Sequence, residues 1–166
     1  MVFVADGAIK VIQLQGNPED VDEFVRLFNI AWMQLPLEAR DQIAAYWVKP
    51  SEFVSAIHLW TDVSLPRVWN DGHHAHFSLP ILREMGESFS VQAIMHELAH
   101  VYFYSVNEPN HWVPAGADKP TKEMTSISCE ELVHEKLQEW GVDQSDLLAW
   151  RDKKEFQMKA DNDAKT

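Results

Sequence analysis

The residues best suited to chemistry in this sequence are His96, Glu97 and His100, which form the pattern H-E-x-x-H. Side chains four residues apart on an α-helix lie on the same face, so His96 and His100 can direct two imidazoles at one metal ion. Glu97 stands beside the first histidine, where its carboxylate can accept a proton from a water molecule on that metal. The spacing therefore predicts a metal site with His96 and His100 as ligands and Glu97 as general base.

The segment that carries this pattern is predicted to be a buried helix. Residues 91–104 contain no glycine or proline and are apolar on nearly every side, which is typical of a helix inside a protein core. Ser88 or Ser90, just after Gly86, is expected to cap its N-terminus. The helix also buries polar groups, Gln92 among them, and buried polar groups need partners. Two hydrogen-bonded core histidines would be the alternative, but the motif within a buried helix favours the metal.

The composition favours one folded domain. Apolar residues make up 46% of the 166 residues, with 7 Trp and 8 Phe, which is enough for a sizeable core. We expect a single domain over residues 1–160 and a frayed tail at 161–166. The net charge is −12, and no basic face is evident, so we expect neither a nucleic-acid nor a membrane partner. The charged run at 151–155 is expected to be solvated surface.

Three features of the sequence bear on its compartment. The single cysteine, Cys129, cannot form an internal disulfide, which favours a reducing environment. No apolar run is long enough to span a bilayer. The N-terminus, residues 1–6, lacks the basic start of a signal peptide. We therefore expect a cytoplasmic protein, and the sequence leaves its oligomeric state open.

The elements that must position the motif alternate between strand and helix patterns. Strands are predicted at 8–14, 53–60 and 73–79, and helices from Asn17 to about Trp32, at 37–47, at 129–140 and at 146–159. Asn70-Asp71-Gly72 is a reverse-turn signal that places the strand at 73–79 in a hairpin. The segment from 105 to 120 holds three prolines and a glycine and is predicted to be a long loop. The order of elements indicates an α+β fold.

A catalytic zinc ion usually has three protein ligands and one open position. The extended pattern H-E-x-x-H-x-x-G-x-x-H is excluded, because Phe103 and Val106 stand at its glycine and third-histidine positions. In the gluzincin peptidases, which share the H-E-x-x-H pattern, the third ligand is a glutamate on a later helix, and Glu130 and Glu131 both fit that plan. His111, in the loop after the motif, is a weaker third choice.

The choice between the two glutamates rests on their neighbours. Four residues after Glu131 stands Glu135, a carboxylate suited to support a ligand, whereas His134 stands four residues after Glu130. We therefore favour Glu131. Against it, Ser128 and Glu131 also form a capping-box pattern, which would occupy Glu131 and leave Glu130 as the ligand.

On these residues the chain resembles the zincin-like metallopeptidases, in the minimal gluzincin-like form of small bacterial and phage peptidases. The resemblance covers about Phe53 to Trp140, although only His-Glu-Leu-Ala-His is specific. It implies a small sheet whose hairpin edge strand, here 73–79, lies beside the active helix and binds substrate as an added strand. The chain departs from larger gluzincins in lacking a clear oxyanion-stabilising residue, for which we considered His111, His134 and Tyr104.

The resemblance and the motif together imply a zinc-dependent peptidase that acts on a peptide or protein substrate. In that interpretation, His96, His100 and Glu131 hold Zn²⁺, which activates a water molecule. Glu97 is then the general base. Two alternatives stay open. The first is a non-catalytic or regulatory zinc-binding interaction module, which a fourth protein ligand would favour. The second is an enzyme that hydrolyses a non-peptide amide.

Overall fold

The computed structural model describes residues 2–4, 9–13, 17–47, 57–61, 69–70, 75–106 and 122–153. Its elements, in chain order, are β1 (Val2–Val4), β2 (Ile9–Gln13), α1 (Pro18–Gln34), α2 (Leu37–Trp47), β3 (Ile57–Trp60), β4 (Trp69–Asn70), β5 (Ala75–Ser78), α3 (Leu79–Met85), α4 (Glu87–Ser105) and α5 (Lys122–Glu139). The architecture is α+β, as expected from the sequence. Within the described residues, no helix combines the length and apolar character needed to cross a membrane.

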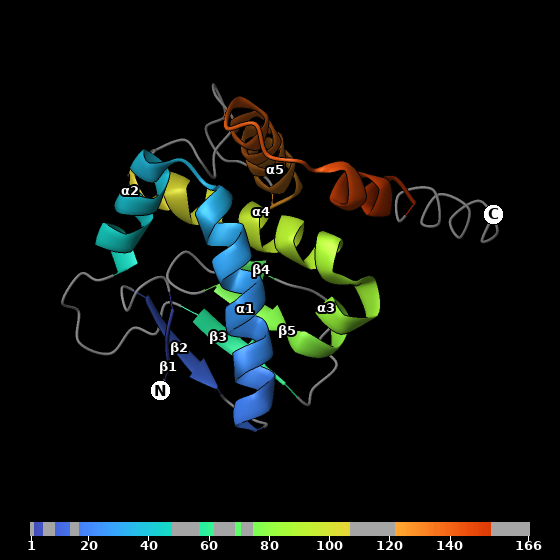
Figure 1. Cartoon of the computed structure of the whole chain (residues 1–166). Helices are drawn as coiled ribbons and strands as arrows, with labels where there is room; N and C mark the ends of the chain where they lie inside the picture. Colours follow the sequence, from blue (N-terminus) through green and yellow to red (C-terminus); the bar gives the residue numbers. More distant parts are fainter. Residues whose placement is uncertain are drawn as a thin grey trace.

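The strands form one mixed sheet in the order β1-β2-β3-β5-β4. The strands β2, β3 and β5 run parallel, whereas β1 and β4 pair antiparallel at the two ends of the sheet. Ile57, Leu59, Ala75 and Phe77 are fully buried on the central strands. The helix α1 crosses in front of the sheet in Figure 1, and Phe24 of α1 packs against Phe77 with ring centroids 5.2 Å apart.

The helix α4 lies at the centre of the molecule. It packs against α1, α2, α3 and α5, and it also contacts β4 and β5. In Figure 1 it passes behind α1, with α5 above it. Its residues from Phe89 to Val101 are all buried, so the predicted core helix is confirmed. Any side chain that α4 directs at α5 is thus held by packing from several directions.

The start of α4 differs from the prediction. The helix begins at Glu87, directly after Gly86, whose φ of 92° lies in a region that favours glycine. Ser90 is therefore inside the helix, and its hydroxyl, which has one hydrogen to donate, lies within hydrogen-bond distance of the carbonyl oxygens of Leu82 (2.9 Å) and Gly86 (2.7 Å). The expectation that Ser88 or Ser90 caps the helix was wrong, because α4 begins at Glu87 and both serines lie within its first turn.

The predicted hairpin is present, but its edge strand is not the predicted one. In β4 and β5, Trp69 pairs with His76 and Asn70 with Ala75, while β5 pairs on its other side with β3. The strand predicted at 73–79 is therefore interior, and β4 is the edge. The turn at 71–74 and residues 53–56 lie outside the described part.

The first two helices match their predictions. Asn17 caps α1 by accepting a hydrogen bond from the backbone N–H of Asp20 (3.1 Å), and Pro18 takes the first helical position. The helix α2 spans the predicted residues. The helix α5 begins seven residues earlier than predicted, at Lys122. It ends near Gly141, whose φ is 74°, as the sequence indicated.

The C-terminal part of the described chain adds one further helical stretch, residues 145–153, which we name the C-terminal segment. It corresponds to the first part of the helix predicted at 146–159. The remainder of that prediction, the tail at 161–166 and the loop with His111 lie outside the described residues.

Candidate metal centre

The helix α4 buries all three residues of the H-E-x-x-H pattern. The exposed fractions of His96, Glu97 and His100 are 8%, 7% and 5%. The two imidazole rings lie side by side, with centroids 5.0 Å apart and planes at 79°. They therefore share one face of the helix, as the four-residue spacing requires. That face is turned towards α5, which packs against α4.

The carboxylate that meets these histidines comes from Glu130 of α5. Its Oε2 lies 2.9 Å from His96 Nε2, and its Oε1 lies 3.1 Å from His100 Nε2. One carboxylate thus bridges both imidazoles. Burial opposes the ionisation of Glu130, but the hydrogen bonds and charges of His100 and His96 outweigh it and hold the pKa of Glu130 well below its usual range. The side chain is therefore an ionised carboxylate that lies between two imidazoles.

The expectation that Glu131 joins the two histidines was wrong in position. Glu131 is exposed, and Glu130 takes the expected place. The reason is the phase of α5. Val133 and Leu137 are fully buried, and Glu130 precedes them by three and seven residues, which puts it on the same helix face. Ser128 is not at the N-terminus of the helix, as a capping box would require, because α5 begins at Lys122.

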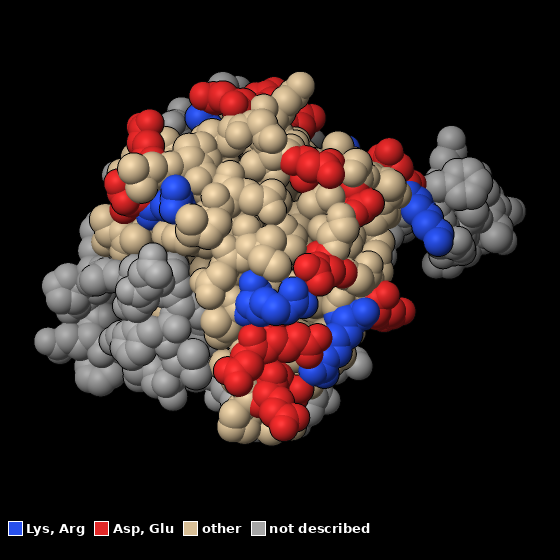
Figure 2. Space-filling view, viewed as in Figure 1, with Lys and Arg blue, Asp and Glu red and all other residues tan. Residues whose placement is uncertain are grey.

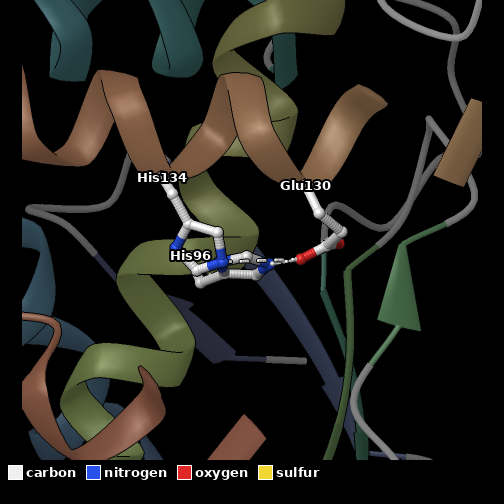
Figure 3. A group of neighbouring side chains, drawn as sticks. All are labelled: His96, Glu130 and His134. Carbon is white, nitrogen blue, oxygen red and sulfur yellow. Dashed lines mark ion pairs between the residues drawn. The ribbon is translucent and has the colours of Figure 1, made fainter. Parts of the chain in front are cut away.

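A third histidine, His134, lies on the same face of α5 one turn after Glu130. Its Nε2 is 4.0 Å from Glu130 Oε2, and its ring centroid is 5.2 Å from that of His96. Figure 3 shows both imidazoles facing the Glu130 carboxylate. One ligand atom from each of His96, Glu130 and His134 lies within 4.8 Å of the others. This group is close enough to hold a metal ion.

Gln144 fixes which nitrogen of His134 carries the proton. The Gln144 Nε2 donates to the His134 backbone carbonyl (3.1 Å), so its Oε1 must be the atom that meets His134 Nδ1 at 2.7 Å. A carbonyl oxygen only accepts, hence Nδ1 carries the hydrogen. Burial, with the charges of His96 and Arg151, lowers the pKa of His134. In the neutral ring, the buried Nε2, which makes no hydrogen bond, presents a lone pair to the metal centre.

Glu97 has the properties expected of a base in this setting. Burial raises its pKa to about 7; the charge of His100 opposes this shift, and that of Glu130 adds to it. A cation bound by the neighbouring histidines would lower the value again. Its side chain lines a cavity of about 280 Å³ together with His96, Glu130 and His134. A molecule in that cavity would therefore meet the carboxylate and the candidate ligands at once.

Arg151 does not lie where its charged sequence context predicts. It was expected to be solvated, as Asp152 and Lys153 are, but it is half-buried and lines the same cavity. Its Nε is buried and makes no hydrogen bond. Leu147 and Arg151 are four residues apart in a helical stretch, so they lie on the same helix face. This spacing is the feature of the sequence that could have indicated that Arg151 is partly buried. The side chain of Tyr104, like His111, lies outside the described residues.

No protein-family model, no curated protein and no solved structure matches this chain. The resemblance to zincin-like peptidases therefore rests on the five residues of the H-E-x-x-H pattern and on the order of the elements around them. Any function has to follow from the geometry and chemistry of the site itself.

The two adjacent glutamates should differ sharply in their effect on metal binding. We expect Glu130→Ala to weaken zinc binding by more than about 100-fold, because changes to groups that merely support a ligand already weaken it by 10- to 100-fold. Glu131→Ala, the matched control, should bind like the wild type, because this side chain is exposed. Competitive zinc titration of both variants and of His111→Ala measures the difference. A loss confined to Glu131→Ala or His111→Ala would contradict the assignment of Glu130.

Proposed function

We propose that the protein is a zinc-dependent peptidase with a zincin-like fold, in which His96, His100 and Glu130 bind the metal and Glu97 is the general base. The observation that carries the proposal is the Glu130 carboxylate, which meets both histidines of the H-E-x-x-H pattern beside the buried Glu97. Two imidazoles and a carboxylate are the ligand set of one well-known class of catalytic zinc sites.

The distances from the Glu130 carboxylate to the two histidines are close to those that a zinc ion would require. A tetrahedral zinc ion has nitrogen and oxygen ligands at about 2.0–2.2 Å, which puts the ligand atoms roughly 3.4 Å from one another. The Glu130 oxygens lie 2.9 and 3.1 Å from the two Nε2 atoms. Small side-chain rotations would therefore admit the ion.

When bound, zinc would polarise the scissile carbonyl and lower the pKa of a water molecule. The chain supplies the proton transfers. Glu97 takes a proton from the attacking water as the water adds to the carbonyl carbon, and then delivers that proton to the leaving amine as the C–N bond breaks. Its position suits this role, because Glu97 lines the same cavity as His96 and Glu130, so a water molecule or substrate there would meet its carboxylate.

A peptide is the favoured substrate because of the edge strand next to the active helix. The strand β4 ends the described sheet on that side, and it contacts α4. An extended peptide can pair with such an edge as an added strand, which holds its backbone by main-chain hydrogen bonds. This arrangement would lay a peptide bond alongside the helix that carries Glu97.

His134 is the observation that favours the second candidate function, a non-catalytic zinc-binding module. Its lone pair at Nε2 faces the metal centre, and Gln144 holds the ring in that orientation. If His134 were a fourth ligand beside His96, His100 and Glu130, the site would have no open position. Closed four-ligand sites are typical of structural zinc.

Access to the metal distinguishes the two candidates. We expect the visible spectrum of the cobalt-substituted wild-type protein to change when acetohydroxamate is added, because a catalytic site keeps a position for water or an added ligand. His134→Ala should respond in the same way. A spectrum that changes only in His134→Ala would mean that four protein ligands enclose the metal, and would favour the binding module.

A further inference from the structure

The cavity beside the metal centre has an apolar wall that is separate from the main core. Phe89 and Ala93 of α4 form a small buried cluster with Leu147 of the C-terminal segment, and Met85 and Trp150 pack against it. The rings of Phe89 and Trp150 meet at 5.6 Å and 63°. All of these residues except Met85 line the cavity. The wall therefore offers an apolar surface next to Glu97.

Two glutamines fasten the C-terminal segment to the helices that carry the site. The buried Gln92, one turn before His96, accepts hydrogen bonds through Oε1 from the backbone N–H groups of Asp146 and Leu147 (2.9 and 3.1 Å). Gln144 bonds in turn to the side chain and carbonyl of His134. The polar group that the sequence buries in α4 thus caps the start of the segment and sets the position of the wall.

Arg151 adds a positive charge to the same cavity. It follows Leu147 by one helical turn, and it lines the cavity with Glu97 and His134. Its Nε is buried without a hydrogen bond, and no ion pair joins it to a carboxylate within the described residues. A buried donor on a charged group is unfavourable unless a partner satisfies it. The planar guanidinium matches a carboxylate, which it can bind through two hydrogen bonds.

We propose that this cavity binds an amino-acid unit with an apolar side chain and a free α-carboxylate, the side chain against Phe89 and Leu147 and the carboxylate on Arg151. The inference rests on the proposed function and names its substrate: an amide whose leaving amine is that amino acid. Water adds to the acyl carbon, the C–N bond breaks, and the products are a carboxylate and the free amino acid. At about 280 Å³, near the lower limit of small-molecule sites, the cavity holds one residue.

The C-terminal residue of a peptide and a small N-acyl amino acid share this chemistry. Binding is measured by calorimetry on the zinc-loaded Glu97→Gln protein, in which turnover is expected to be slow, with N-acetyl-L-phenylalanine, its amide and N-acetylglycine as probes. We expect N-acetyl-L-phenylalanine to bind about 10- to 100-fold more tightly than its amide. This is the gain in affinity that a charge-assisted hydrogen bond between the carboxylate and Arg151 would give. The same order is expected in the metal-free protein, because neither Arg151 nor the apolar wall belongs to the metal ligands.

Variants separate the two halves of the cavity. Arg151→Gln should remove the preference for the acid over the amide, whereas Lys153→Gln, an exposed charge on the same segment, should keep it. Leu147→Ala should reduce the preference for N-acetyl-L-phenylalanine over N-acetylglycine. Ala93→Leu should reduce the same preference by filling the cavity. Because the two substitutions change the volume of the cavity in opposite directions, a shared effect would not come from a folding defect in one of them. An unchanged acid-to-amide ratio in Arg151→Gln would overturn the proposal.

Hydrolysis by the wild type shows whether the substrate is a peptide or an N-acyl amino acid. It also tests the cavity assignment separately from the peptidase activity. Faster cleavage of Ala-Ala-Phe than of N-acetyl-L-phenylalanine would identify peptides as the source, and the reverse would identify N-acyl amino acids. Cleavage of internal peptide bonds with no preference for a free carboxylate would overturn the inference while supporting the peptidase. Arg151-dependent binding without cleavage of any probe would support the cavity assignment and contradict the peptidase.

Discussion

Replacing Glu97 with glutamine should leave zinc bound and lower hydrolysis by about 10²- to 10⁴-fold, the range typical of a general acid–base group. Glutamine keeps the size of the buried side chain, so α4 should still pack, but it cannot accept a proton from the attacking water. The comparison is of kcat/KM on a peptide library, with the zinc content of both proteins measured by elemental analysis.

The glutamine variant should not be destabilised, and this separates a chemical effect from a folding defect. Burial raises the pKa of Glu97 to about 7, so ionising this carboxylate in the metal-free folded chain is unfavourable. A neutral amide avoids burying that charge. We expect its melting temperature without metal to be no lower than that of the wild type. Glu131→Gln, an exposed glutamate, is the matched control and should keep full activity. Cleavage that persists in Glu97→Gln would refute the assigned base.

The helices α1 and α2 were predicted correctly because short-range features of the sequence determine where they begin and end. The bounds of α1 and α2 follow from the Asn17 cap, the adjacent Pro18 and the proline at position 36, all of which act within one helical turn. The pairing of His96 with His100 follows from helix geometry alone. These features depend on neighbours along the chain, so no knowledge of the tertiary structure was needed.

The carboxylate that meets the two histidines was misassigned because its identity depends on how two helices dock. Glu130 and Glu131 differ by about 100° around the axis of α5, and either could face α4 until packing selects one. The buried Val133 and Leu137 make that selection. The strand β5 was misplaced for a similar reason. Its sequence, Ala-His-Phe-Ser, alternates between apolar and polar residues although all four are buried. Alternation distinguishes the two faces of a strand and does not show whether another strand pairs along its edge.

Arg151 shows the limit of reasoning from charge. The run that contains it has the composition of solvated surface, and Asp152 and Lys153 are indeed exposed. The position of Arg151 depends on Gln92 and Gln144, which hold the C-terminal segment against α4 and α5. Those contacts join residues from three separate parts of the chain, so no local sequence pattern predicts them.

Zinc should bind at one equivalent per chain, and its removal should lower the melting temperature by on the order of 10 °C. A ligand present at about 1,000 times its Kd stabilises a fold by roughly 4 kcal/mol, and each kcal/mol shifts the melting temperature of a domain of this size by about 2–4 °C. The metal-free chain should remain folded, because Glu130 bridges His96 and His100 directly. Calorimetry with and without a chelator measures the shift.

Substitution of the histidines tests whether that stabilisation comes from this site. His96→Ala and His100→Ala should each lose bound zinc and become insensitive to the chelator, since both remove a ligand that α4 buries. His58→Ala, on β3, is the control for loss of a histidine elsewhere and should still bind one zinc ion. Equal metal content in the wild type and in both α4 variants would place the zinc elsewhere. The ligand set of His96, His100 and Glu130 would then be refuted, and with it the zinc peptidase.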